Sequence, residues 1–204
     1  MNKQKLLKML AESGYNIGFG AKINLSTFEI IEKAPGWLGF ISFVVGILAL
    51  FIPSLSDDKI IASLLLIFSL ITMNIAYYQQ DKDKYSKSGS TLTQYFHKLR
   101  EMYYTVQSTD EPFDFSEIIE EHRNLVAKAS EDTISKQIFS SDWLAHIKFF
   151  GQHQIGWMDE QLKFRFFKDK IPASFKIVVY AAAIVLFVWK FKDMLEFIQT
   201  FCKG

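Results

Sequence analysis

Two uncharged apolar segments, separated by four residues, constrain this chain more than any other feature of its sequence. Residues 37–55 and 60–78 contain no charged side chain. Each is about 19 residues long, close to the roughly 20 that a helix needs to cross the hydrocarbon core of a bilayer. A core helix of a soluble bundle normally keeps one polar face, and neither segment has a charge anywhere on its circumference. The sequence therefore predicts two transmembrane helices rather than two soluble core helices.

The connection between these segments predicts how they pair and which way they face. It consists of Ser56, Asp57, Asp58 and Lys59, and helices joined so briefly must be antiparallel neighbours. Lysine and arginine residues are frequent after the second segment, whereas the connection offers only Lys59. The positive-inside rule therefore places the tip of the hairpin outside, with the N-terminus and residues 79–170 in the cytoplasm.

Small and polar residues inside the two segments are candidates for helix packing and for a pore. The small residues share one face of the first segment, which lets another backbone approach closely in lipid. The second helix of the hairpin is the favoured partner, and a neighbouring copy is the alternative. The polar groups of the second segment either bond to their own helix and to a neighbour, or line a pathway. The packing candidates are Gly39, Ser42, Gly46 and Ala49, and the pore-lining candidates are Ser63, Ser69, Thr72 and Asn74.

The N-terminal residues predict two short helices. Residues 1–12 form an amphipathic pattern that Gly14, Gly18 and Gly20 interrupt. Residues 21–33 predict a second helix, and we expect Ala34, Pro35 and Gly36 to end it.

The region after the hairpin predicts further helices. Five apolar residues from Leu92 to Val106 repeat at intervals of three and four, which indicates a helix with a narrow seam. Asp114 with Glu117 resembles a capping box that opens the next helix, and we expect these two helices to pair as an antiparallel hairpin. Residues 134–170 predict one more helix, kinked at its glycines. The seam residues are Leu92, Phe96, Leu99, Tyr103 and Val106.

Residues 177–189 form a third uncharged apolar stretch, flanked by Lys176 and Lys190. It is short for a span, although lysines at both ends can extend toward the interface. A third transmembrane helix is favoured over a helix that lies in the interface. The sequence thus predicts an all-α membrane protein with four regions: N-terminal cytoplasmic helices (1–36), a transmembrane hairpin (37–78), a cytoplasmic helical domain (79–170) and a C-terminal membrane or interfacial segment (171–204).

Catalytic chemistry is not indicated by any motif in the sequence. Phosphate-binding loops, nucleophile elbows and metalloprotease helices are not found. His146 and His153 are seven residues apart, which does not suit a metal site built from adjacent helical turns. Cys202 is the single cysteine and has no positioned base in its sequence neighbourhood. We expect no enzyme activity, no metal and no cofactor.

A basic and aromatic stretch near residues 157–176 is the candidate for ligand binding. Cationic groups beside aromatic rings suit a nucleotide or a single-stranded oligonucleotide, because charge meets phosphate and a ring meets a base. The alternative, which is favoured, is a juxtamembrane helix whose lysines meet anionic headgroups. The nucleotide-binding candidates are Trp157, Lys163, Phe164, Arg165, Lys168 and Lys170.

The order of these features resembles a known family. Residues 21–26 (Ala-Lys-Ile-Asn-Leu-Ser), then a membrane hairpin, then residues 81–85 (Asp-Lys-Asp-Lys-Tyr) and a long helix through residues 95–99 are similar to the SLATT family. These are bacterial effector domains with two transmembrane helices, associated with nucleotidyltransferases of the SMODS class and with SLOG domains. The similarity covers about residues 15–135, and the segment from residue 177 onward departs from the two-helix pattern.

The resemblance implies a function that the residues alone do not. It implies a pore-forming effector in the bacterial inner (plasma) membrane that acts in anti-phage defence and depolarises the membrane. A nucleotide or oligonucleotide made by a partner nucleotidyltransferase would control the pore. One hairpin cannot enclose water, so we expect a homo-oligomer, with a tetramer as the working copy number. The rival hypothesis is a non-conducting membrane anchor that recruits a partner through its cytoplasmic helices.

Overall fold

The longest element of the computed structural model is the helix α1 (Lys3–Phe51), which runs through both predicted N-terminal helices and the first apolar segment. The structure describes residues 2–110, 112–152 and 155–201, with side chains described up to residue 191 except for residue 189. Buried residues from Leu6 to Ile31 recur along α1 at the helical spacing of three and four. The predicted break after residue 12 is wrong, because tertiary packing along this face outweighs a helix cost of about 1 kcal/mol per glycine.

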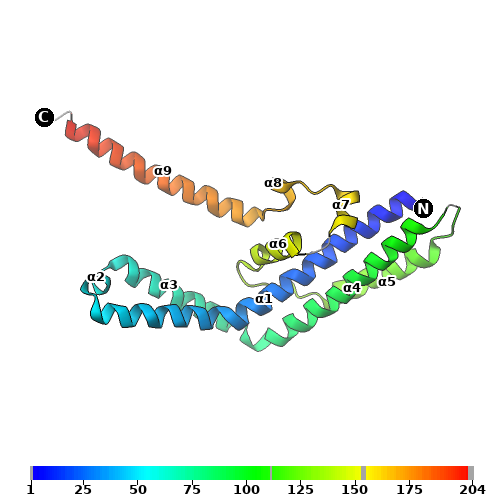
Figure 1. The fold of residues 1–204 in the computed structure, drawn as a ribbon, viewed down its shortest axis with the longest axis horizontal. Coiled ribbons are helices and arrows are strands. Elements are labelled where there is room, and N and C mark those ends of the chain that lie inside the picture. Colours follow the sequence, from blue (N-terminus) through cyan, green and yellow to red (C-terminus); the bar gives the residue numbers. More distant parts are fainter. Residues whose placement is uncertain (1, 111, 153–154, 202–204) are drawn as a thin grey trace. The chain divides into compact units, whose positions relative to one another are not determined.

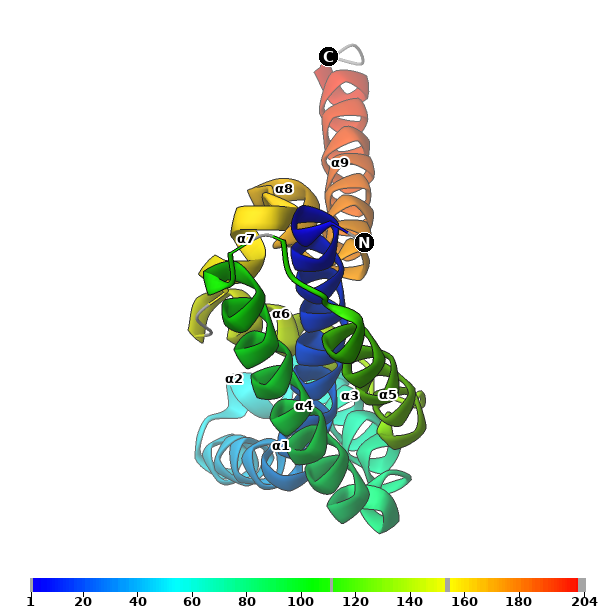
Figure 2. The same cartoon turned by 90° about the vertical axis from the view of Figure 1, so that its right-hand side faces the viewer.

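Pro35 lies inside α1 and does not end it, so the predicted helix end at residues 34–36 is also wrong. A proline removes one hydrogen bond from the helical ladder and commonly kinks the helix. Figures 1 and 2 show α1 bent between its N-terminal part and the part that leads to α2. The two parts pack against different helices, and this packing keeps α1 helical on both sides of the proline.

The N-terminal glycines of α1 serve as packing sites for large side chains. A Cβ added at Gly18 would lie 2.6 Å from Cδ2 of Phe96 on α4. Gly14 lies under the ring of Trp157, where a Cβ would also overlap the ring. The missing side chains therefore let α4 and α7 approach the backbone of α1.

The predicted helical hairpin is confirmed. α1 ends before Pro53, because the residue that precedes a proline is pushed out of the helical region and Ile52 is extended. A short helix, α2 (Pro53–Ser56), makes the turn, and α3 (Lys59–Ala76) returns along α1. Asp58 caps α3, because its carboxylate accepts a hydrogen bond from the backbone N–H of Ile60 at 2.7 Å.

Four helices and a short 3-10 turn complete the first of two compact units, residues 1–163. They are η1 (Gln79–Asp81), α4 (Lys82–Ser108), α5 (Ser116–Asp132), α6 (Ser141–Gln152) and α7 (Gly156–Leu162). The N-terminal part of α1 packs against α4, α5, α6 and α7, and Figure 2 shows α1, α4 and α5 side by side. We call this assembly the bundle (residues 3–31 with α4–α7) and the rest of the unit the hairpin (residues 37–51 with α2 and α3).

The seam predicted on α4 is confirmed, and its five residues are all buried. It packs inside the chain, where Phe96 meets Gly18 of α1 and Tyr103 meets Trp157 of α7. α4 and α5 also contact each other, as predicted. The predicted capping box is wrong, because the N-cap of α5 is Phe115, which makes no side-chain cap hydrogen bond. Asp114 instead accepts hydrogen bonds from the backbone and hydroxyl of Ser116. The seam is therefore covered within one chain and forms part of the bundle core.

Residues 133–140 are not helical, which corrects the single helix predicted for residues 134–170. We call them the linker segment. Hydroxyl groups of neighbouring helices hold its backbone: Tyr85 donates to the carbonyl of Lys136 at 2.6 Å, and Tyr78 donates to the carbonyl of Gln137 at 3.3 Å. These side-chain hydrogen bonds replace those of a helix.

The second unit, residues 164–204, contains α8 (Phe166–Asp169) and α9 (Ala173–Phe201). The apolar stretch predicted at residues 177–189 lies within α9, and its described apolar side chains, such as Ile177 and Phe187, are exposed. A third transmembrane helix stays a prediction. Helices make up 85% of the structure and no strand occurs among the described residues, which confirms the all-α class.

Candidate functional site: the hairpin and its junction with the bundle

The two long helices of the hairpin face each other along one narrow line. The less exposed residues of the hairpin recur at intervals of three and four, the spacing of two helices packed along a seam. Every other position on α3 is exposed. The inward residues are Leu38, Ser42, Val45 and Ala49 on α1, and Ile61, Leu65, Phe68, Thr72 and Ile75 on α3.

The remaining large apolar side chains of α3 and of the hairpin part of α1 are exposed. Leu50 is 82% exposed, and Phe43 and Leu66 are each 67% exposed. A continuous exposed apolar surface marks a membrane or protein contact. Among the described residues, α1 and α3 are the two helices long and apolar enough to cross a membrane. The hairpin is therefore the part of this unit whose surface suits contact with a membrane or with another apolar protein surface.

The pore-lining candidates lie on different sides of α3. The hydroxyls of Ser63, Ser69 and Thr72 donate to the carbonyls four residues earlier, at 2.7, 3.0 and 2.9 Å, as expected for polar groups satisfied by their own helix. Thr72 belongs to the inward line, whereas Ser63, Ser69 and Asn74 are exposed. Within one chain these four groups form no single polar stripe, and pore lining stays a prediction.

The packing candidates on α1 divide into two pairs. Ser42 and Ala49 belong to the inward line and face α3. Gly39 and Gly46 are exposed, and a Cβ added at either would meet nothing within 4 Å among the described residues. The second helix of the hairpin therefore covers one pair and leaves the glycine pair open.

The nucleotide-binding candidates belong to both compact units. Trp157 is 2% exposed and packs on Phe96 and Tyr103, and its role as a stacking platform stays a prediction. Lys163 ends α7 with a left-handed backbone (φ 50°) and belongs to the first unit. Phe164, Arg165, Lys168 and Lys170 belong to the second unit, where the Asp169 carboxylate accepts from the N–H of Arg165 at 2.8 Å.

A polar network joins the linker segment to α1. Gln137 donates from Nε2 to the side chain of Asn24 at 3.2 Å, and Thr27 donates to Oε1 of Gln137 at 2.5 Å. Asn24 in turn donates to the carbonyl of Gly20 at 2.9 Å. Asn24 and Thr27 are buried, and buried polar groups are costly unless paired. Gln137 therefore fixes the linker segment on one face of α1.

Apolar packing places the hairpin against the same segment. Ile31 of α1, Ile75 of α3, Tyr85 of α4 and Ile138 of the linker segment form one buried cluster. Lys82 lies beside this cluster and pairs with Glu32 at 2.5 Å. The base of the hairpin is thus attached to the bundle through Ile75 and Ile138.

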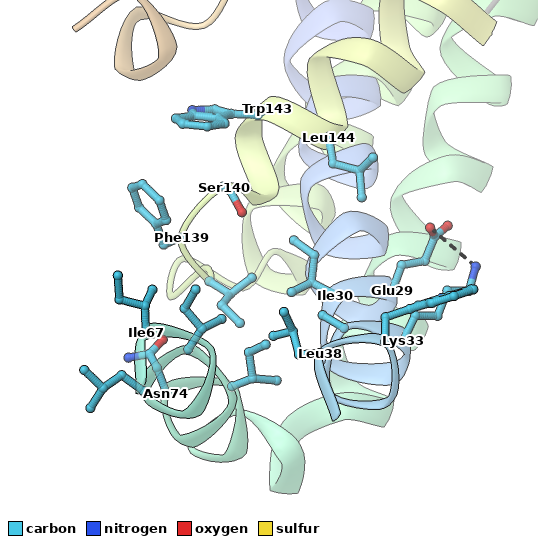
Figure 3. Close-up of a pocket in the computed structure, with 16 residues that line it drawn as sticks. Glu29, Ile30, Lys33, Leu38, Ile67, Asn74, Phe139, Ser140, Trp143 and Leu144 are labelled. Carbon is cyan, nitrogen blue, oxygen red and sulfur yellow. Dashed lines mark ion pairs between the residues drawn. The ribbon is translucent and has the colours of Figure 1, made fainter. Parts of the chain in front are cut away.

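A cavity of about 960 Å³ opens where hairpin, linker segment and α6 meet. Figure 3 shows its walls: Ile67 and Asn74 below, Phe139 and Trp143 above, and Ile30 and Leu38 of α1 across from them. We call it the junction cavity. Its lining is mainly apolar, and its polar members are Glu29, Lys33, Asn74 and Ser140.

Three lysines surround one carboxylate at the edge of this cavity. Glu29 lies 3.8 Å from Lys33 and also pairs with Lys148 of α6. Burial and the nearby Lys148 ammonium lower the pKa of Lys22, and Glu29 opposes this shift. The edge therefore carries more positive than negative charge.

Sequence reasoning missed the junction because its parts come from four separate segments. The polar residues Asn24 and Thr27, which interrupt the apolar face of α1, were the available signal that this face meets a polar partner. Nothing in the sequence pairs them with Gln137.

Metal and histidine positions add no further site. No group of three or more potential ligands is found in the part of the chain that the structure describes. His146 pairs through Nδ1 with the backbone carbonyl of Asp142 at 2.9 Å. His153 and Cys202 lie outside the described residues.

These features define an all-helical protein with an apolar hairpin that can cross a membrane, attached to a packed helical bundle. Residues 1–179 match the family model of the SMODS and SLOG-associating 2TM effector domain 6. The chain belongs to this family of two-transmembrane effector domains, which confirms the resemblance drawn from the sequence. No curated protein and no solved structure matches it significantly.

Proposed function

We propose that this protein is a pore-forming effector of a bacterial anti-phage defence system. In this proposal the hairpin lies in the inner membrane, with the N-terminus and the bundle in the cytoplasm. A nucleotide or oligonucleotide made by a partner nucleotidyltransferase sets the open state, and opening depolarises the membrane. Membership of a two-transmembrane effector family supports the class of the proposal.

The observation that carries the proposal is the continuity of α1. One helix is buried in the bundle from Leu6 to Ile31 and exposes apolar side chains from residue 37 to its end. A displacement of the bundle half of α1 would therefore move the membrane half directly. A helix shared between two packed regions suits a device that couples ligand binding to a change in the membrane.

Assembly is required because one antiparallel pair cannot enclose water. On α1, Gly39 and Gly46 each follow an inward residue by one position. On α3, Ala62 and Ser69 also follow inward residues by one position. Each of these four residues is therefore rotated by about 100° from the inward line of its own helix, in the same sense along the chain. Because the two helices are antiparallel, this rotation brings all four residues to the same side of the hairpin. We propose this small-residue side as the contact between copies, with a tetramer as the working number.

Gating requires a ligand that prefers one arrangement over the other. Lys163, Arg165, Lys168 and Lys170 are the proposed phosphate contacts, and Phe164 is the proposed stacking ring. Repetition of these groups around an oligomer axis would concentrate positive charge despite the net charge of +1 for the whole chain.

Conductance in planar bilayers tests the pore. The full chain should give discrete current steps, and Gly46→Leu should reduce their frequency by blocking contacts between copies. Val44→Leu adds bulk on the opposite side of the same helix and is the matched control, so its currents should be unchanged. Assembled protein that carries no current at any ligand concentration would contradict the pore and favour the non-conducting anchor.

A pore-facing charge gives a second test. Ser63→Lys should change conductance while leaving the oligomer mass unchanged, because Ser63 is exposed and lies about 200° from the inward line, outside the small-residue side. Ser69 and Thr72 are less suitable for this test, since Ser69 belongs to the proposed contact between copies and Thr72 faces α1. An unchanged current with Ser63→Lys would remove Ser63 from the pore lining.

Ligand binding is tested with labelled single-stranded oligonucleotides and cyclic nucleotides across a salt series. A phosphate site should weaken steeply with salt and weaken again in the double variant Lys163→Ala, Arg165→Ala. If this variant binds and gates normally but loses affinity for anionic vesicles, the stretch contacts lipid headgroups instead.

A further inference from the structure

The junction cavity has the size and chemistry of a ligand site. Its volume of about 960 Å³ lies within the range of roughly 300–1,000 Å³ typical of small-molecule sites. Ile71, Phe139 and Leu144 contribute apolar walls from three different elements. An apolar cavity of this size is a poor place for water, because water needs polar partners. The occupant should therefore be mainly apolar.

The position of the cavity identifies where such an occupant comes from. Its α3 wall includes Ile67, Leu70 and Ile71, which are 48, 60 and 42% exposed. The same side chains belong to the outward apolar surface of the hairpin. If the hairpin lies in a bilayer, the cavity is continuous with the hydrocarbon around it, and lipid chains are the apolar groups at hand.

One edge of the cavity is polar and positively charged. Lys33 is 64% exposed in its side chain and stands one helical turn before Trp37, an aromatic residue type enriched at the membrane–water interface. Glu29 and Lys33 lie together at the edge away from Phe139 and Trp143 (Figure 3). A cationic edge beside an apolar cavity matches the two ends of an anionic amphiphile.

We propose that the junction cavity binds one phospholipid from the surrounding membrane, with an acyl chain among Ile71, Phe139 and Leu144 and the phosphate beside Lys33. The inference rests on the membrane location of the hairpin in the proposed function and not on conduction. Bound lipid would touch α3, the linker segment and α6 at once. Occupancy would therefore stabilise this placement of the hairpin on the bundle.

Photo-crosslinking of the full chain in vesicles of phosphatidylethanolamine and phosphatidylglycerol tests the site. A benzophenone amino acid in place of Phe139, which is 72% exposed at the cavity wall, should yield a protein adduct with the mass of a phospholipid. The same amino acid in place of Phe113, which is 53% exposed on the loop before α5, should yield none. The Trp143 position provides a second probe at the cavity if the Phe139 variant folds poorly.

A filled cavity should lose the lipid. Ile71→Trp places an indole in the cavity and should lower the adduct yield about tenfold, the factor that corresponds to about 1.4 kcal/mol. Leu66→Trp makes the same kind of change on α3 away from the cavity and should leave the yield unchanged. Circular dichroism of both variants checks that they are folded.

The headgroup contact is tested by charge removal. Lys33→Gln should reduce the ratio of phosphatidylglycerol adducts to phosphatidylcholine adducts at the cavity about fivefold, equivalent to about 1 kcal/mol. Lys8→Gln is the matched control, because Lys8 also pairs with a glutamate four residues away, Glu12. Its lipid preference should not change.

Three results would overturn the lipid site: adducts to a second copy or to α9, no adduct at either cavity position, or equal lipid adducts at the cavity and at Phe113. Lipid adducts in a protein without conductance support the site and count only against the pore, so the two proposals fail separately.

Discussion

The two halves of α1 use the same residue types for opposite purposes. In the bundle half, Gly14 and Gly18 lie under the rings of Trp157 and Phe96. In the hairpin half, a Cβ at Gly39 or Gly46 would meet nothing within 4 Å among the described residues. Gly14 and Gly18 are packing sites within the chain, whereas the surface at Gly39 and Gly46 is open to lipid or to another protein molecule.

Large apolar residues show the same contrast. Phe149 is 0% exposed in the bundle, whereas Phe43 is 67% exposed in the hairpin. A soluble protein rarely exposes so continuous an apolar surface. The chain therefore completes the core of the bundle by itself, whereas the hairpin needs lipid or further copies to cover its apolar surface.

The largest effect on this comparison should come from truncation of a buried ring. Phe149→Ala should lower the free energy of unfolding of the bundle by about 3–5 kcal/mol, through lost burial and the cavity left behind. Phe43→Ala, the control in the hairpin, should change it by less than about 0.5 kcal/mol. Urea titration in detergent measures the free energy of unfolding of both variants. Similar losses for the two variants would contradict the difference in packing between the bundle and the hairpin.

The next effect should come from adding bulk at the glycines. Gly18→Leu should destabilise the bundle by about 1–3 kcal/mol, because Phe96 and Phe149 occupy the space that the side chain needs. Gly46→Leu should leave bundle stability unchanged and act on assembly instead. A loss of bundle stability in Gly46→Leu would show that the side of the hairpin at Gly46 already packs against the bundle within one chain.

A smaller effect should follow from loss of a hydrogen bond to the linker segment. Tyr85→Phe removes the donor to the carbonyl of Lys136 and should cost about 1 kcal/mol, since that carbonyl loses its partner. Tyr95→Phe removes an exposed hydrogen bond to Asp132 and is the control. Equal stability of the Tyr85 variant and the wild type would mean that the linker segment is held by packing alone.

The smallest effect should be a pH dependence at His122. This ring is 6% exposed and pairs through Nε2 with Ser13 at 2.8 Å. Burial and then the Arg123 charge lower the pKa of His122 below its ordinary value of 6.5. As the pH falls below 6.5, the unfolded chain therefore takes up the proton before the folded chain does. The free energy of unfolding decreases as the pH falls, until the pH has passed the folded-state pKa of His122.

Thermal unfolding checks this direction. Between about pH 7.5 and 5.5, on either side of an ordinary histidine pKa, the melting temperature should fall less in His122→Gln than in the wild type. His97→Gln, on the exposed face of α4, should retain the wild-type difference. A wild type that melts higher at the acidic pH would contradict the assignment.

The sequence predicts the hairpin and the α4 seam because both depend on local patterns. The absence of charge over residues 37–55 and the spacing from Leu92 to Val106 are sufficient evidence for each. The continuity of α1 depends on tertiary contacts at Gly14 and Gly18, which local helix-breaking rules do not include.

The junction could not be predicted for the same reason. Gln137 is polar and lies in an unremarkable sequence, yet it joins Asn24 and Thr27 across more than 100 residues. Trp157 lies beside basic residues and looked like a ligand contact, but Gly14 provides the space that buries it. Such pairings follow from the fold and have no local pattern of their own.

Cysteine labelling determines whether the hairpin lies in the membrane with the bundle on its inner side. Single cysteines are placed at Asp57→Cys, Leu66→Cys and Ser108→Cys with Cys202 replaced by serine. A membrane-impermeant maleimide applied to intact bacterial spheroplasts should label the first, leave the second unlabelled, and label the third only after permeabilisation. Labelling of Leu66→Cys as rapid as that of Asp57→Cys, or labelling of Asp57→Cys only from the inside, would contradict the account.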